Sequence, residues 1–400
     1  MTTTITPNVT NASAVRVELD SPAWDELLGQ ITQQLAQTAA QHDRDGSFPH
    51  ANFDYLQQHG LLALTVPKAL GGYEASLSQT AAVIHAVARG EPSTALVLVM
   101  QYLFQLSIAR NENWPAHLRE RVAAEAVKDG ALINALRVEP ELGTPARGGL
   151  PGTIARRTPE GWRISGTKIY STGIPRLTWL AVWARSDDAD PLVGAWLVHR
   201  DTPGITVVED WDHLACAPAV VIAWCLMTCW CRWSTQWKSR RPASPANRMA
   251  RSTAGSACCC PPCMTVWRMP RVTGLCNGRT AACPPIWARP CRACRAFRKA
   301  GRSGSTVVRQ PRRARCRRAG PHPSGRPGPD QIHRHRQRHC RRAKKIAELT
   351  GNPGLSRHNP LERHLRDVLC SRIHTPQNDA ILTTAGKAAF AAAAAQPRSH

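Results

Sequence analysis

Residues 59–98 read HGLLALTVPKALGGYEASLSQTAAVIHAVARGEPSTALVL, and this stretch decides the fold expected for the first part of the chain. The apolar run LLALTVP and the turn Gly71-Gly72 lead into two helices, predicted at about residues 76–89 and 93–110. The second helix is apolar nearly all round, which is typical of a helix at the centre of a helical core. The stretch therefore predicts a helical domain.

Helix signals continue on both sides of this stretch. Ser21-Pro22 combines a capping side chain with the residue best tolerated at the first helical position, and apolar residues follow at helical spacing. A short helix is predicted from residue 53 to 59, and another from Pro115 to Lys128 that stops at Gly130. We therefore expect an N-terminal helical domain over residues 21–130.

The first 20 residues have neither a basic region nor an apolar core, so they do not resemble a signal peptide and we expect them to be disordered. The longest apolar run, Ala95 to Leu106, is broken by Gln101 and is shorter than the ~20 residues that span a bilayer. These features predict a cytoplasmic protein with reduced thiols and no membrane partner.

From Leu132 onward the pattern changes from helical to strand-like. Short runs rich in β-branched and aromatic residues alternate with turn signals such as Pro159-Glu160-Gly161. The runs are INALRVE, GTIARR, GWRISGTKIYS, LTWLAVWAR, VGAWLVHR and GITVVED. Because the helices predicted up to residue 130 all precede these strands, we expect a β-domain over residues 131–214 as a separate layer or domain, in an α+β fold.

The end of the chain returns to helical spacing. Apolar residues recur at this spacing at Ile346, Leu349, Leu361, Leu365, Val368 and Leu369. We expect the remnant of a C-terminal helical bundle over residues 344–390, followed by a disordered tail at 391–400. Arg363, Arg366 and Asp367 are expected to form a buried set of salt bridges within this bundle.

Several of these segments resemble the acyl-CoA dehydrogenase family. Residues 59–98 are similar to its N-terminal helical domain, and ISGTKIYSTGI is similar to its flavin-contacting strand, Gly-x-Lys-x-(Trp or Tyr)-Ile-Thr-Asn. ALRVEPELGTP resembles its Leu-Thr-Glu-Pro-x-x-Gly-Ser-Asp loop, and PLERHLRD its Pro-x-Glu-Arg-x-x-Arg-Asp motif. The resemblance covers roughly residues 25–214 and 343–390. It implies a helical N-terminal domain, a middle β-domain and a C-terminal helical bundle.

The resemblance also implies a cofactor, FAD, bound between the last two parts. It places Tyr170, Ser171 and Thr172 beside the isoalloxazine ring, and Leu136, Val138, Gly143 and Thr144 along the flavin and acyl-thioester side. Gln377 in the tail completes the expected cofactor-binding residues. Two positions depart from the family pattern, since Val138 replaces a flavin-bonding Thr and Pro145 replaces an Asp.

The implied activity is oxidation of an acyl-CoA thioester to its 2,3-enoyl form. Its implied partners are an electron-transfer flavoprotein or another acceptor and further copies of the same chain. In the family a glutamate removes the α-proton, but Thr375 stands at that position here and its hydroxyl is no base at neutral pH. Either another helix supplies the base, or the protein is a reduced-flavin-dependent monooxygenase of the same fold, in which His374 could act. The catalytic residue stays open.

Residues 215–343 differ in composition from the rest of the chain. They contain 27 of the 52 Lys and Arg residues, one of the 28 acidic residues, and 14 of the 15 cysteines. One interpretation is a zinc site, formed by Cys260-x-x-Cys263, Cys291-x-x-Cys294, His333, His335, His339 and Cys340. A second is a nucleic-acid-binding segment, in which PRRARCRR and HRHRQRHCRR contact phosphates.

Both interpretations leave part of the family fold missing, because the segment interrupts the β-domain and the chain resumes inside a helix. Translation in the wrong frame explains this. When the last base of each codon is joined to the first two of the next, Trp224-Cys225 must give valine, Met227-Thr228 aspartate and Trp230-Cys231 valine, as in a family strand. We predict that residues 215–343 are out of frame and disordered, without metal or nucleic acid, and that this polypeptide is inactive.

Overall fold

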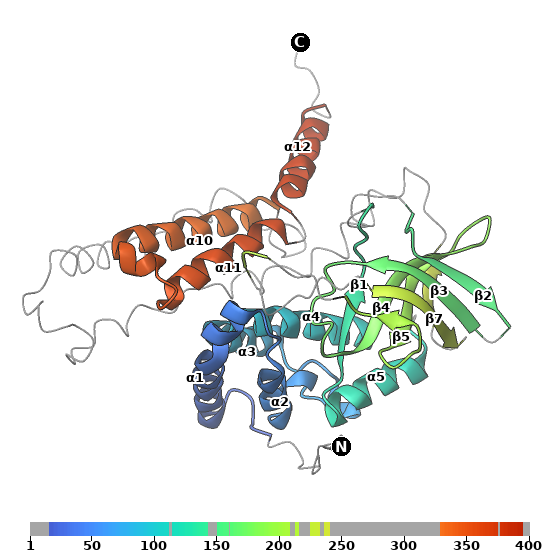
Figure 1. Ribbon diagram of the computed structural model, residues 1–400, viewed down its shortest axis with the longest axis horizontal. Helices are drawn as coiled ribbons and strands as arrows, with labels where there is room; N and C mark the ends of the chain where they lie inside the picture. Colours follow the sequence, from blue (N-terminus) through green and yellow to red (C-terminus); the bar gives the residue numbers. More distant parts are fainter. Residues whose placement is uncertain are drawn as a thin grey trace, which may run out of the picture. The chain divides into compact units, whose positions relative to one another are not determined.

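The computed structural model describes residues 16–111, 114–142, 150–159, 161–208, 213–215, 225–232, 236–240, 329–374 and 377–394. The chain divides into two compact units, residues 1–250 and 251–400. The first unit contains helices followed by a sheet, and the second contains helices (Figure 1). The expected order of helices, sheet and helices is confirmed.

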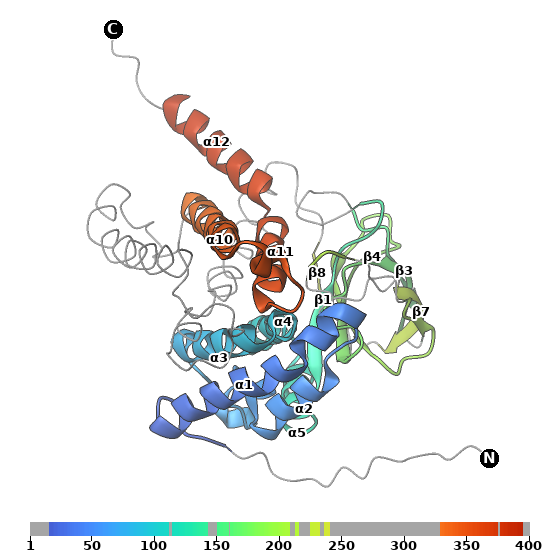
Figure 2. The same ribbon diagram turned by 60° about the vertical axis from the view of Figure 1, so that its left-hand side comes forward.

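The first unit begins with five α-helices at the positions that the sequence predicts. They are α1 (Pro22–Asp45), α2 (His50–Gln58), α3 (Leu77–Gly90), α4 (Pro92–Ala109) and α5 (Ala116–Lys128), with two short 3-10 turns, η1 (Leu61–Ala63) and η2 (Lys68–Leu70), between α2 and α3. Ser21 caps α1 by accepting a hydrogen bond of 3.1 Å from the Trp24 amide. α1 packs against α3, and α3 against α4 (Figure 2).

Replacing Ser21 with alanine is expected to lower the free energy of unfolding by about 1 kcal/mol, because the Trp24 amide loses its acceptor. Ser21→Thr retains the hydroxyl and is the control. Denaturant unfolding of the two variants tests the cap, and an equal loss in both would contradict it.

Residues 16–20 also contact the body of the unit, although disorder was expected for residues 1–20. The Arg16 guanidinium donates a hydrogen bond to the Gly71 carbonyl and lies 5.2 Å from the centre of the Tyr73 ring. The correction has a simple cause, since arginine recognises a turn carbonyl and an aromatic face together. Residues 1–15 lie outside the described residues.

Helix α4 is long and apolar enough, by length and composition, to cross a membrane. Within the described residues, however, 61% of this window is buried in the unit, as in the core helix of a folded domain. Gln101, which interrupts the apolar run, donates to the carbonyls of Leu62 and Ala131 at 3.2 and 3.1 Å and accepts from the Ile133 amide at 2.7 Å. Its amide therefore ties α4 to the start of the sheet.

Eight strands of the described residues form one sheet. They are β1 (Leu132–Leu136), β2 (Ile154–Thr158), β3 (Gly161–Lys168), β4 (Leu177–Ser186), β5 (Val193–His199), β6 (Ile205–Thr206), β7 (Cys225–Arg232) and β8 (Gln236–Arg240). Their order is β6-β7-β3-β2-β4-β5-β8, with β1 pairing in parallel with β4. β2 and β3 form an antiparallel hairpin, in which Ile154 pairs with Ser165 and Thr158 with Gly161.

The sheet extends beyond the boundary expected at residue 214. β7 pairs with β3 along its whole length, from Gly161 opposite Arg232 to Lys168 opposite Cys225, and β8 pairs with β5. Backbone pairing accepts almost any residue except proline, so β7 and β8 can join the sheet despite their unusual composition. Residues 241–328 lie outside the described residues.

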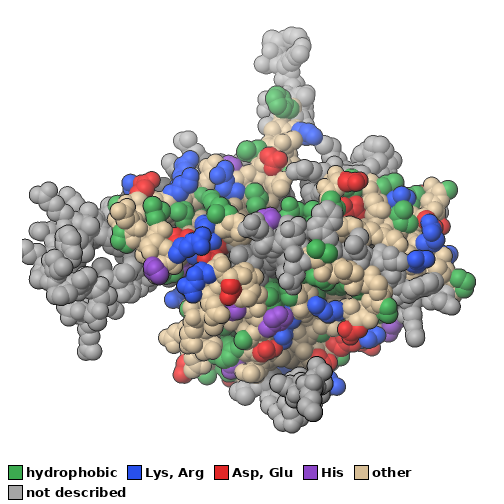
Figure 3. Space-filling model, viewed as in Figure 1, with side chains coloured by type: hydrophobic (Ala, Val, Ile, Leu, Met, Phe, Trp, Pro, Cys, Tyr) green, Lys and Arg blue, Asp and Glu red, His purple; other side chains and the backbone are tan. Residues whose placement is uncertain are grey.

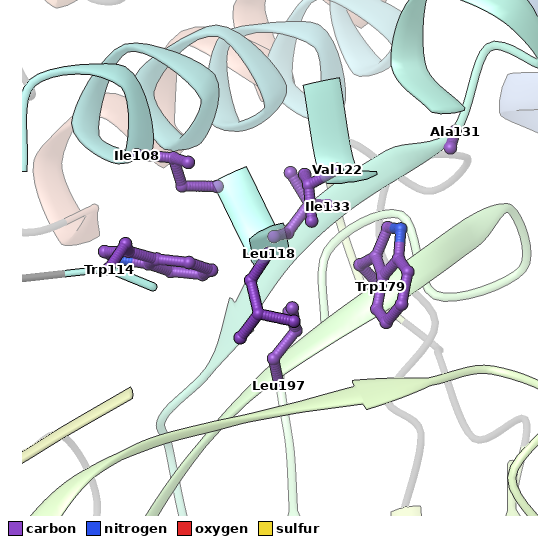
Figure 4. Close-up of a cluster of buried hydrophobic side chains, with 8 residues drawn as sticks. All are labelled: Ile108, Trp114, Leu118, Val122, Ala131, Ile133, Trp179 and Leu197. Atoms are coloured by element: carbon purple, nitrogen blue, oxygen red, sulfur yellow. The ribbon is translucent and has the colours of Figure 1, made fainter. Parts of the chain in front are cut away.

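The helices and the sheet of the first unit share a hydrophobic core, so of the two expected arrangements, separate layers or separate domains, they form layers. Figure 4 shows how side chains from both meet. The cluster contains Ile108, Trp114, Leu118 and Val122 from the helical part, and Ala131, Ile133, Trp179 and Leu197 from the sheet and its entry. A sheet face carrying large apolar side chains needs cover, and α4 and α5 supply it.

The second unit contains α10 (Pro329–Thr350), the 3-10 turn η7 (Asn352–Leu355), α11 (Pro360–Ile373) and α12 (Asn378–Ala394). Buried residues of α10 and α11, among them Ala343 and Val368, pack together, with Leu365 and Leu369 beside them. α10 begins at Pro329, earlier than the boundary expected at 344, because no glycine or further proline interrupts it. α12 continues past residue 390 through an alanine-rich run. Figure 3 shows Lys and Arg side chains over this unit, with acidic side chains among them.

Candidate functional site

The two segments expected to face a flavin lie side by side in the first unit, where β1 and β3 end. Val138 and Ile169 form an isolated antiparallel bridge, in which the Ile169 amide donates to the Val138 carbonyl at 2.9 Å. The Asn134 side chain donates to the Thr172 carbonyl at 3.0 Å. We call residues 136–139 and 168–172 together the β1–β3 edge. Sequence segments about thirty residues apart are thus joined by backbone and side-chain hydrogen bonds.

Tyr170, Ser171 and Thr172 form a tight turn at this edge. Tyr170 has φ 56°, in the left-handed region, and 48% of its side chain is exposed. Such a conformation costs a non-glycine residue about 1–3 kcal/mol and is kept only where its surroundings impose it. Ser171 is buried and its Oγ has no hydrogen-bond partner among the described residues, whereas Thr172 is half-buried. The turn therefore combines an exposed aromatic ring with two hydroxyl groups.

The other expected cofactor-binding residues are distributed differently. Leu136 is fully buried, as Ser171 is. Val138 is half-buried at the edge. Gly143 and Thr144, with Pro145, lie outside the described residues. Gln377 is half-buried and precedes α12 in the second unit. The structure therefore brings together Leu136, Val138, Tyr170, Ser171 and Thr172.

A buried ion pair at the same edge was missed by the sequence reasoning. Lys168 Nζ lies 2.6 Å from Glu139 Oε1, and the two side chains are 0% and 8% exposed. Lys168 is the Lys of the motif in ISGTKIYSTGI, and Glu139 is the Glu of the motif in ALRVEPELGTP. The signal available in the sequence was an acidic residue in one family motif and a basic residue in the other.

Glu139 accepts hydrogen bonds from two separate parts of the chain, residues 152–153 and Lys168. Besides Lys168, Oε1 accepts from the Thr153 amide at 2.9 Å and the Thr153 hydroxyl at 2.6 Å, and Oε2 accepts from the Gly152 amide at 2.7 Å. Burial by itself would raise the pKa of Glu139, but these hydrogen bonds outweigh burial and hold the pKa at about 2. Burial lowers the pKa of Lys168, and its bond to Glu139 partly offsets this. At neutral pH we assign both groups as charged.

Gly166 makes room for this arrangement. A Cβ at this position would lie 2.5 Å from the Thr153 hydroxyl oxygen, which itself bonds Glu139. Glycine is therefore required on β3 because Thr153 approaches its backbone closely.

The ion pair predicts a specific loss of stability in acid. Because the pKa of Glu139 is about 2 in the folded protein and 4.5 in the unfolded chain, its contribution is complete above pH 4.5 and is lost as the pH falls towards 2. We expect it to be on the order of 3 kcal/mol, from 1.4 kcal/mol per pKa unit. Denaturant unfolding across this range, compared with Glu139→Gln, measures it. A constant difference between the two proteins from pH 5 to pH 2 would contradict the assignment.

The residue types at the β1–β3 edge fit an isoalloxazine ring, which is a flat apolar ring system with polar atoms on its rim. Val138 and Tyr170 supply apolar surface, and the hydroxyl groups of Ser171 and Thr172 supply hydrogen bonds. The buried Oγ of Ser171, which has no partner within the part of the chain that the structure describes, is a polar group that a ligand atom at this edge would satisfy.

In the second unit, the motif PLERHLRD forms part of α11. Arg366 binds Glu362 through two hydrogen bonds of 2.8 and 2.9 Å, and Arg363 and Asp367 are buried. The Arg366–Glu362 pair lies within one helix, so the expected salt-bridge set of Arg363, Arg366 and Asp367 stays a prediction. His374 ends α11, and Thr375 lies outside the described residues.

The residues of the zinc interpretation are only partly described. His333, His335, His339 and Cys340 lie on α10, where Nε2 of His335 and Nε2 of His339 are 3.0 Å apart and Cys340 is buried. Both CxxC pairs lie outside the described residues. Among the side chains that the structure describes, no group of three or more His, Cys, Asp and Glu could hold a metal ion.

Comparisons with known proteins point to the same family as the sequence resemblance. Residues 26–111 match the family model described as acyl-CoA dehydrogenase, N-terminal domain. The chain is 33% identical over 192 residues to a putative acyl-CoA dehydrogenase, YdbM, of Bacillus subtilis, covering 48% of this chain and 50% of that protein. It is 30% identical over 225 residues to L-evernosamine nitrososynthase of a Micromonospora species, covering 52% and 51%. The chain thus spans about half the length of these relatives.

The fold also agrees with solved structures. That of PigA with FAD and proline has a TM-score of 0.65 at 15% identity, and covers 92% of this chain and 98% of that one. At this identity the likeness shows the fold alone, in which helices precede and follow a middle sheet.

Proposed function

We propose, from the premise that this chain is a protein of the acyl-CoA dehydrogenase family, that its gene encodes an FAD-dependent oxidoreductase acting on an acyl-CoA thioester. The single observation that carries the proposal is the β1–β3 edge, where two family motifs meet beside a strained turn. Relatives named as dehydrogenases of CoA thioesters, such as benzylmalonyl-CoA dehydrogenase at 31% identity, support the substrate class.

The proposed reaction removes two hydrogens from the acyl chain. The α-carbon loses a proton to a base and the β-carbon loses a hydride, so a 2,3-double bond forms and two electrons leave the substrate. FAD, when bound, supplies the acceptor for the hydride. Val138 and Tyr170 would pack against the ring, and the hydroxyl groups of Ser171 and Thr172 would bond its polar atoms. The base is unassigned, because Thr375 occupies the family's glutamate position.

We further propose that residues 215–343 are translated out of frame and that the chain as written is inactive. Two observations support this: the forced codons in residues 224–231, and the matches to curated relatives, which extend over 177 to 225 residues. That is about the length of the N-terminal resemblance. Resequencing the gene across codons 210–345 tests the reading frame, and an unchanged sequence would contradict it.

Flavin absorbance gives the test of cofactor binding. We expect the purified full chain as written to be colourless. The chain with its reading frame restored should be yellow, because bound oxidised flavin absorbs blue light. A yellow full chain would contradict the inactivity proposal. A colourless frame-restored chain would contradict the proposed function.

A second candidate is a reduced-flavin-dependent monooxygenase of the same fold. Relatives named as nitrososynthases favour it, because that name describes oxidation at nitrogen on an amino sugar rather than at an acyl chain. The absence of a carboxylate at position 375 favours it as well, since oxygenation needs no α-proton abstraction.

Product analysis separates the two candidates in the frame-restored chain. The first predicts a 2,3-enoyl-CoA from an acyl-CoA series with an artificial electron acceptor. The second predicts an N-oxidised product from an amino sugar nucleotide with reduced flavin and oxygen.

We propose a cytoplasmic homo-oligomer that passes its electrons to an electron-transfer flavoprotein or another acceptor, and native mass determination tests the oligomer.

A further inference from the structure

The ion pair between Glu139 and Lys168 lies directly beside the residues proposed to face the flavin. Glu139 follows Val138 in the chain, and Lys168 precedes Ile169, so the pair flanks the single backbone bridge that joins the two segments. Because the side chains meet at 2.6 Å, they fix which residue of one segment lies opposite which residue of the other.

Glu139 also joins this edge to a third segment. Its two oxygens accept from the amides of Gly152 and Thr153 and from the Thr153 hydroxyl, immediately before β2. The carboxylate therefore connects the end of β1, the end of β3 and the entry to β2 at one point.

The turn that follows Lys168 needs such an anchor. Tyr170 is in the left-handed region, and such a conformation persists only where the surrounding structure over-determines it. On its far side, the Asn134 amide holds the Thr172 carbonyl at 3.0 Å. The turn is therefore held at both ends, by the ion pair through Lys168 and by Asn134 through Thr172.

Stability alone does not account for an ion pair at this position. Two apolar side chains of similar size often stabilise a buried site as well as a charged pair, because the pair must be removed from water. A charged pair adds direction, since its hydrogen bonds hold only in one geometry. The chain has this arrangement where the backbone is strained and where the proposed ligand would bind.

We propose that Glu139 and Lys168 are positioning residues that hold the Tyr170–Thr172 turn in the geometry required for flavin binding. The proposal rests on the proposed function for the identity of the ligand. The geometry of the turn itself is a property of the chain without ligand and is tested separately.

Hydrogen exchange of the full chain, without added flavin, tests the turn. Three backbone amides report on the turn. The Ile169 amide donates to the Val138 carbonyl, the Thr172 amide to the Tyr170 carbonyl, and the Ile174 amide to the Ser171 carbonyl. In Glu139→Gln and in Lys168→Met we expect their exchange to accelerate at least about tenfold, the effect of losing a hydrogen bond to a charged group. Arg156→Met, which removes the exposed Arg156–Asp187 ion pair of the same sheet, should leave these amides unchanged.

The double variant Glu139→Leu/Lys168→Met separates positioning from simple stabilisation. We expect its unfolding midpoint to return towards that of the unchanged chain, while the amides at residues 169–174 remain fast. Restored protection of these amides in the double variant would overturn the proposal, as would unchanged protection in both single variants.

FAD binding to the frame-restored chain tests whether the ion pair affects flavin affinity. We expect the dissociation constant to rise at least about tenfold in the double variant, because the turn no longer matches the ring. Unchanged affinity would overturn the link to the ligand. Absence of FAD binding in the frame-restored chain without substitutions would overturn the proposed function, and the exchange result would still decide whether the pair positions the turn.

Discussion

Replacing Lys168 with methionine is expected to lower the free energy of unfolding by about 3–5 kcal/mol, the usual cost of breaking a buried ion pair. The reason is the carboxylate that remains. Glu139 is 6% exposed, and without Lys168 it keeps its charge in the interior with only neutral donors. Denaturant unfolding of the full chain at pH 7, followed by circular dichroism, measures the loss.

Two further substitutions control this result. Arg156→Met removes an ion pair of the same sheet whose side chains are 66% and 33% exposed, and we expect a loss of less than about 1 kcal/mol. Glu139→Leu combined with Lys168→Met removes both charges and should recover most of the loss. Equal losses from Lys168→Met and Arg156→Met would contradict the burial of the pair.

Replacing Trp179 with alanine is expected to lower the free energy of unfolding by a similar amount, about 3–5 kcal/mol, through the cavity that it leaves. Trp179 is 2% exposed on β4 and lies in the core shared by helices and sheet. Its indole nitrogen donates to Glu125 of α5 at 2.7 Å, and the Arg121 guanidinium lies 4.9 Å from its ring centre. The side chain therefore joins the sheet to α5.

Trp179→Phe is the matched control, because it retains an aromatic ring and loses the hydrogen bond to Glu125. We expect it to cost less than half as much as Trp179→Ala. Exchange of the β1 and α5 amides, measured in the same proteins, should accelerate together if the two elements share one core. Faster exchange of α5 with unchanged β1 would indicate two independent domains instead.

Much of the first unit could be predicted from the sequence, because its signals are local. Ser21-Pro22 starts a helix through its own side chain and ring, and the expected strands reappear as β1 to β6 within a few residues. Capping, fixed φ angles and apolar periodicity act over a few neighbouring residues.

The candidate site was predictable only in part. Val138 and Tyr170 were proposed from family motifs, whereas the contact between Glu139 and Lys168 needed the tertiary structure that brings the ends of β1 and β3 together. The two residues are 29 positions apart, and no local pattern states which residues of two strands lie opposite each other.

The structure of the segment from residue 215 was also predicted incompletely from the sequence. Its composition suggested disorder, yet β7 pairs with β3 and α10 starts at Pro329. Strand pairing uses backbone groups that every non-proline residue carries, so β7 can form in either reading frame. The presence of β7 therefore neither supports nor contradicts a frame error, and only the nucleotide sequence can decide it.

By itself, the sequence determined the helices, the strands, their order and the resemblance to a family, because each depends on residues close together in the chain. Only the tertiary structure decided that helices and sheet share one core around Trp179, and that Glu139 and Lys168 meet beside a strained turn. These contacts depend on long-range packing, because they join segments that are far apart in the chain. No pattern among neighbouring residues shows which distant segment each will contact.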